Sequence, residues 1–144
     1  MVRMDAKQFR RQFIKNELGV KTKGSHDNPE HRLQVACIKW MRYKRRDLYR
    51  VLFAVPNGGQ RDRITAAVLR DEGVRAGVAD LILLKSNDKY GALCLEMKTP
   101  DGRQSQRQKE WQRDCELFGS GKYVICRSLE DFQTAVDNYV NNIE

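Results

Sequence analysis

The sequence contains no long apolar run and no N-terminal secretory signal. None of its stretches approaches the roughly 18 apolar residues that a membrane-spanning helix requires. The N-terminal residues MVRMDAKQFRRQ lack the apolar segment of a secretory signal. We therefore expect a cytoplasmic protein with no membrane partner.

Paired cysteines and a phosphate-binding P-loop are also missing. The pattern G-x-x-x-x-G-K-[ST] does not occur, and no two cysteines form a CxxC motif. Each cysteine lies in an apolar stretch, so the sequence predicts buried, reduced thiols in preference to disulfides or a zinc site. The four cysteines are Cys37, Cys94, Cys115 and Cys126.

Basic residues are in excess, with 27 lysines and arginines against 19 aspartates and glutamates and a formal net charge of +8. This excess favours an acidic partner such as a nucleic acid, although a soluble protein that is merely basic has the same composition. A length of 144 residues fits one domain. We assign residues 1–27 to a basic N-terminal arm and residues 28–144 to the domain. The arm could pack on the domain, contact DNA or bridge to a second subunit.

The spacing of apolar residues from position 28 onward predicts alternating helices and strands. Asn28 as a cap and Pro29 in the first turn indicate a helix that continues to about Lys44. The other predicted elements are a strand at 48–56, a helix at 62–72, strands at 80–85 and 91–98 joined by a turn at 86–90, a helix from Ser105 to about Gly119 that buries Trp111, Cys115 and Phe118, a strand at 122–127 and a helix at 129–142. This order predicts an α/β domain with a mixed sheet of about four strands flanked by helices.

Acidic and basic side chains meet at one end of the predicted hairpin. Alternation along residues 91–98 puts Glu96 and Lys98 on the same face, about 7 Å apart along the strand. If the hairpin is antiparallel, Asp80 at the start of the preceding strand lies beside them. Two carboxylates repel each other unless a cation lies between them, and oxygen ligands suit Mg²⁺ or Mn²⁺. The alternative is an ordinary salt bridge between Glu96 and Lys98.

Two further polar residues are candidates for the same site. Gln108 precedes Trp111 by three residues and shares the apolar side of its helix, where a buried amide needs a hydrogen-bond partner. Glu30 opens the first helix just ahead of its apolar stripe. Either the helix dipole stabilises this acid there, or Glu30 contacts a metal or water.

Glycines and basic residues near these acids are candidates for contacts with phosphate. The stretch VPNGGQRDR is either a simple strand-to-helix turn or a backbone that approaches a phosphate closely. Basic residues in KWMRYKRRDLYR and around Arg103 and Arg107 would form a cationic rim, or they are solvated faces of helices. The candidate DNA contacts are Asn57, Gly58, Arg61, Arg63, Arg103 and Arg107.

The ordered series of Glu30, PNGG, GVRAGVADLILLK, LEMKT and GRQSQRQKEW resembles the VRR-NUC (virus-type replication-repair nuclease) domain, a branch of the PD-(D/E)XK nuclease superfamily. The resemblance runs from about residue 29 to residue 130 and is to standalone members from phages and bacteria. It departs from the family at Ala79, where proline often precedes the acid. The resemblance implies a restriction-endonuclease-like core and, for a phage-encoded chain, the cytoplasm of a bacterial host.

The same resemblance implies roles for the candidate residues. Asp80, Glu96 and the backbone carbonyl of Met97 would bind Mg²⁺ or Mn²⁺, and Lys98 would hold the attacking water. Gln108 would support the site and Glu30 would complete it. The implied activity is that of a metal-dependent DNA endonuclease acting on branched DNA such as Holliday junctions, as a homodimer.

Two other functions remain open from the sequence. A non-catalytic DNA-binding module on a nuclease fold, within a replication or repair assembly, would explain the basic charge. Retained, mutually repelling acids argue against it. A ribonuclease or RNA-binding domain would need aromatic platforms on its surface, whereas the two tryptophans fall on the apolar sides of helices.

Overall fold

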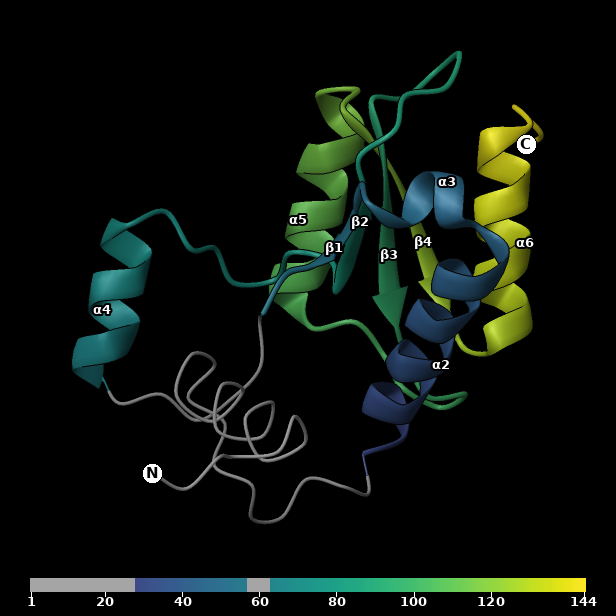
Figure 1. The fold of residues 1–144 in the computed structure, drawn as a ribbon. Coiled ribbons are helices and arrows are strands. Elements are labelled where there is room, and N and C mark those ends of the chain that lie inside the picture. Colours follow the sequence, from purple (N-terminus) through teal and green to yellow (C-terminus); the bar gives the residue numbers. More distant parts are fainter. Residues whose placement is uncertain (1–27, 57–62) are drawn as a thin grey trace, which may run out of the picture.

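The computed structural model describes residues 28–56 and 63–144, which form an α/β domain (Figure 1). One mixed sheet carries four strands in the order β1-β2-β3-β4. The strands are β1 (Leu52–Ala54), β2 (Leu81–Leu83), β3 (Ala92–Met97) and β4 (Gly121–Cys126), and the helices are α2 (Pro29–Lys44), α3 (Arg46–Tyr49), α4 (Arg63–Asp71), α5 (Gln106–Leu117) and α6 (Leu129–Val140). This confirms the predicted fold class. The proposed N-terminal arm lies outside the described residues.

The strands pair in two ways. β1 with β2 and β2 with β3 are antiparallel, and the second pair sets Leu81 opposite Leu95. The predicted hairpin is therefore confirmed, and its turn is held by the Asn87 side chain, which accepts hydrogen bonds from the N–H groups of Lys89 and Tyr90 at 2.9 and 2.8 Å. β3 and β4 are parallel, and α5 makes the crossover between them.

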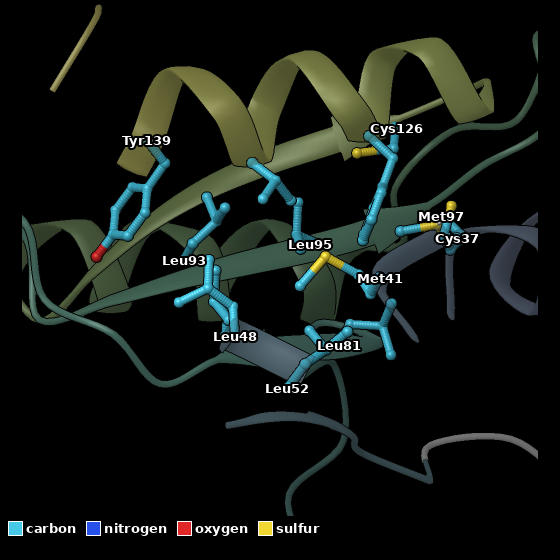
Figure 2. Packing of buried hydrophobic residues seen from close by; sticks show 13 residues of the cluster. Cys37, Met41, Leu48, Leu52, Leu81, Leu93, Leu95, Met97, Cys126 and Tyr139 are labelled. Atoms are coloured by element: carbon cyan, nitrogen blue, oxygen red, sulfur yellow. Dashed lines mark hydrogen bonds between the residues drawn. The ribbon is translucent and has the colours of Figure 1, made fainter. Parts of the chain in front are cut away.

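Helices cover both faces of the sheet, with α5 on one side and α2 and α6 on the other (Figure 1). Because side chains alternate along β3, Leu93, Leu95 and Met97 enter the main apolar core, seen in Figure 2. Cys94 and Glu96 face α5 instead. The polar site therefore lies on the side of the sheet that α5 covers.

The predicted helix starts are confirmed by their caps. Asn28 accepts a hydrogen bond from the Glu30 N–H at 3.0 Å, and Pro29 occupies the first turn of α2. Ser105 and Gln108 form a capping box at the start of α5. No helix in the described part of the chain is long and apolar enough to cross a membrane.

Two predictions about apolar segments are wrong. Residues 48 and 49 belong to the short helix α3, because their N–H groups bond to the Arg45 carbonyl and Leu48 packs into the core; the strand is only Leu52–Ala54. Phe118 is 79% exposed. The Cys115 side chain lies next to Gly121, where β4 begins. Phe118, three residues after Cys115, therefore lies beyond the end of the sheet and is not covered by it.

The cysteines are free thiols, as predicted. Burial raises the pKa of Cys37, Cys94 and Cys126 to about 12. The Sγ atoms of Cys94 and Cys115 lie 3.9 Å apart.

Candidate active site

The antiparallel register of β2 and β3 brings the predicted acids together at one end of the sheet. Asp80 immediately precedes β2, and its Oδ2 accepts a hydrogen bond from the Met97 N–H at 2.7 Å. In a strand, the N–H and C=O of one residue point toward the same neighbouring strand. Along β3 these groups therefore point to β4 at one residue and to β2 at the next. The Met97 carbonyl therefore faces the side of β3 on which Asp80 lies.

Glu96 and Lys98 are buried, at 1% and 8% exposure. Within residues 28–56 and 63–144, no other charged side chain is buried to this extent. Lys98 Nζ lies 3.6 Å from Glu96 Oε1, so the predicted pair exists, but it is no surface salt bridge. Burying an ion pair brings little or no net stability, because desolvation offsets the attraction. A functional role explains these buried charges better than stability does.

Glu96 is held by hydrogen bonds from two other elements. Gln108 Nε2 on α5 donates to Glu96 Oε1 at 2.6 Å, and the Tyr123 hydroxyl on β4 donates to Glu96 Oε2 at 3.2 Å. Gln108 thus points to the site, as the helical spacing predicts. Tyr123 was not among the sequence candidates, because nothing in KYVICR indicates which strand register brings its hydroxyl to Glu96.

Burial raises the pKa of both carboxyl groups. Burial is the main cause that raises the pKa of Glu96 to about 7, and the charge of Asp80 adds to it while Lys98 opposes it. Burial likewise raises the pKa of Asp80, against the hydrogen bond from Met97. Near neutral pH Glu96 therefore holds part of a proton that an isolated carboxylate would release. A divalent cation would add to the positive charge that Lys98 already places beside this pair.

Glu30 contributes to the same electrostatic environment from a third element. It is partly buried in the first turn of α2, and its negative charge raises the pKa of Asp80. Its backbone N–H donates to Asn28. Glu30 therefore lies on the acidic side of the site without a direct bond to the two central acids among the described contacts.

The donor set fits a hard divalent ion that keeps part of its water shell. Within the described ranges no group of three His, Cys, Asp or Glu side chains is arranged to enclose a metal. Mg²⁺ is usually bound by one or two carboxylates together with water and substrate phosphate oxygens. Asp80, Glu96 and the Met97 carbonyl match this pattern of ligands.

The predicted phosphate contacts are only partly described. Arg103 and Arg107 are exposed, one in the loop before α5 and the other in its first turn, next to Gln108. Arg63 begins α4, which lies to one side of the sheet (Figure 1). The predictions for Asn57, Gly58 and Arg61 fall outside the described residues.

A mixed sheet with an acid before one strand and a Glu-x-Lys pair closing the next is typical of a nuclease-type domain. The family model described as the VRR-NUC domain matches residues 28–129, and the chain belongs to this family. The resemblance seen in the motifs is thereby confirmed. The family makes this a nuclease-type domain that acts on DNA.

A solved structure described as a VRR_NUC domain protein has a similar fold. The TM-score is 0.69 at 20% sequence identity, and the similarity covers 81% of this chain and 92% of the other. None of the curated proteins matches the chain.

Proposed function

We propose that this protein is a divalent-metal-dependent DNA endonuclease that hydrolyses phosphodiester bonds. The observation that supports this most is the convergence of Asp80, Glu96 and Lys98 at the end of the sheet, with two of these charges buried. Such an arrangement is costly for folding and suits a reaction at a phosphate.

Asp80, Glu96 and the Met97 carbonyl would hold Mg²⁺ or Mn²⁺. When bound, such an ion polarises the scissile phosphate and lowers the pKa of water, which favours nucleophilic attack at phosphorus. Gln108 keeps the Glu96 carboxyl oriented through its 2.6 Å hydrogen bond. Glu30 adds negative charge at the edge of the site and so favours a cation there.

Lys98 would orient the attacking water and stabilise the charge that develops on the phosphate. Its ammonium has three N–H donors and no acceptor, and it lies 3.6 Å from Glu96 Oε1. It is therefore suited to donate hydrogen bonds to a water or to a phosphate oxygen beside the acids.

Exposed arginines would bring DNA to these acids. The phosphate backbone and the carboxylates have the same sign of charge, so a nuclease needs cations around its acidic centre. Arg107 is exposed next to Gln108 in the first turn of α5, and Arg103 is exposed in the loop that precedes this helix. Contacts of this kind attract DNA without reading its sequence.

The proposed substrate is branched DNA, such as a Holliday junction, cut by a homodimer. This part rests on the resemblance to standalone VRR-NUC proteins. One active site cuts one strand at a time, so symmetric resolution of a four-way junction requires two subunits related by a two-fold axis.

Cleavage of a labelled DNA panel tests the proposal. The panel contains a four-way junction, a splayed arm, a flap, a linear duplex and a single strand, each with Mg²⁺, Mn²⁺ or chelator. Lys98→Met removes the ammonium but keeps most of the buried stem. Lys122→Met is the matched control, because Lys122 lies on β4 opposite Leu93, at the other end of the sheet.

Each outcome is decisive for one part of the proposal. Metal-dependent cuts that Lys98→Met abolishes and Lys122→Met keeps would support the nuclease, and paired cuts confined to the junction, with a dimeric mass in solution, would support the resolvase. Cuts on every duplex would discard the branched substrate. Tight DNA binding without cleavage in either metal would favour a non-catalytic DNA-binding module.

A further inference from the structure

We propose that Tyr123 is a positioning residue that orients Glu96 for metal binding; this inference rests on the proposed function. Its hydroxyl donates to Glu96 Oε2 at 3.2 Å, while Gln108 donates to Oε1 at 2.6 Å. Each carboxylate oxygen therefore has its own donor, one from a strand and one from a helix. Tyr123 is 7% exposed, so water does not readily replace its hydroxyl.

Glu96 needs such support more than Asp80 does. A glutamate has one more rotatable bond than an aspartate, and Asp80 is already held by the backbone N–H of Met97. Two donors on different elements define the plane of the Glu96 carboxylate, and Oε2, whose partner is Tyr123, keeps a lone pair for a cation, whereas Oε1 also faces Lys98. Groups that orient a metal ligand in this way commonly change metal affinity when they are removed.

Tyr123 is itself held in place on three sides. The parallel register sets it opposite Cys94, two residues before Glu96 on the same face of β3. Its ring packs against Trp111 on α5, with 6.0 Å between ring centroids. The Gln104 side chain also interacts with the hydroxyl, and Gln104 Nε2 donates to Gln112 Oε1 at 2.8 Å. Because these contacts hold the Tyr123 hydroxyl in place, it can hold the Glu96 carboxylate in one orientation.

A purely structural tyrosine would also be buried and hydrogen-bonded, so the test needs a control with that property. Tyr139 on α6 is 1% exposed, and its hydroxyl donates to the carbonyls of Lys85 at 2.6 Å and Tyr90 at 3.3 Å. It lies in the core on the other side of the sheet. Tyr139→Phe therefore removes a buried hydroxyl of the same kind without touching Glu96.

The experiment measures Mn²⁺ binding to the full chain without DNA, by the paramagnetic resonance signal of free Mn²⁺. We expect Tyr123→Phe to raise the Kd for Mn²⁺ by about tenfold or more, the range found when a support of a metal ligand is removed. Tyr139→Phe should leave the Kd within about twofold of wild type, the scatter expected of a site that it does not contact. Melting temperatures of both variants record the common cost of losing a buried hydroxyl.

A second readout separates positioning from a general structural effect. In cleavage assays, Tyr123→Phe should raise the Mn²⁺ concentration needed for half-maximal rate more than it lowers the rate at saturating metal. An unchanged Kd in Tyr123→Phe would overturn the inference while wild-type cleavage leaves the proposed function intact. If wild type itself neither binds Mn²⁺ nor cleaves DNA, the proposed function fails, and the inference fails with it.

Discussion

Gln108 connects the start of α5 to the Glu96 carboxylate. Its side-chain oxygen accepts the Ser105 N–H at 2.8 Å, while its side-chain nitrogen donates to Glu96 Oε1 at 2.6 Å. The residue that caps the helix therefore also holds the acid at the end of the sheet. A shift of α5 would therefore move Gln108 and change the orientation of Glu96, the candidate metal ligand.

Gln108→Glu should keep the cap and disrupt the site. A glutamate at this helix position still accepts the Ser105 N–H, but it places a third carboxylate against Glu96. We expect cleavage to be lost and the metal-free protein to be less stable at pH 8 than at pH 5, relative to wild type. Gln106→Glu is the control, because Gln106 donates to Glu110 at 3.2 Å on the exposed surface of α5, so it also places two carboxylates together but in solvent; we expect normal cleavage and a stability change of only about 0.2–0.5 kcal/mol. Urea denaturation at both pH values would measure this, and a fully active Gln108→Glu enzyme would contradict it.

The raised pKa of Glu96 predicts a pH-dependent stability of the metal-free protein. Because its pKa rises from 4.5 to about 7 on folding, the folded state binds this proton more tightly than the unfolded chain does. The resulting stabilisation is complete below about pH 4.5 and is lost as the pH rises through about 7. Glu96→Gln should therefore be more stable than wild type at pH 8 in chelator, by on the order of 2 kcal/mol, and inactive. Equal urea midpoints at pH 8 would show that Glu96 has no such burial cost.

Gly77→Ala should displace the N-terminus of α5. Gly77 has a φ of +86°, and a Cβ there would lie 2.5 Å from the Arg107 carbonyl oxygen and 3.0 Å from the Gln108 nitrogen. Gly73→Ala is the matched control, because Gly73 has a φ of +98° but no atom within 4 Å of the added carbon. Both variants should lose about 1 kcal/mol of folding stability, because alanine disfavours a left-handed backbone. Only Gly77→Ala adds a steric clash. Thermal denaturation should show a larger loss for Gly77→Ala, with reduced cleavage; equal losses would mean that the loop shifts freely.

Arg127 should hold the loop between Lys98 and α5. Its Nη1 donates to the carbonyls of Thr99 at 2.6 Å, Pro100 at 3.2 Å and Gly102 at 2.7 Å. Arg127→Met removes these charge-assisted bonds, which we expect to cost about 1–3 kcal/mol. Amide hydrogen exchange in residues 99–104 should become faster and cleavage slower. Arg113→Met is the control, because Arg113 is exposed and pairs with its neighbour Asp114. Unchanged exchange in the loop would contradict the role of Arg127.

Much of the fold follows from local pattern in the sequence. Asn28, Ser105 and the apolar spacing after them predict helix starts that the structure has, because a cap and a helical period involve residues only a few positions apart. The prediction failed where a local pattern was ambiguous. Leu48 is apolar in either a strand or a helix, and its packing into the core beside α2 decides for the helix.

The candidate site likewise combines features set by local sequence pattern with features set by tertiary packing. The sequence by itself determined that Glu96 and Lys98 share a face of one strand, because side chains alternate along any strand, and that Gln108 lies on the apolar side of its helix. Only the tertiary structure decided that the Tyr123 hydroxyl reaches Glu96, 27 residues away in the chain, and that Gly77 lies against Arg107. These contacts depend on strand register and helix placement, which result from packing of the whole core and not from the spacing of neighbouring residues.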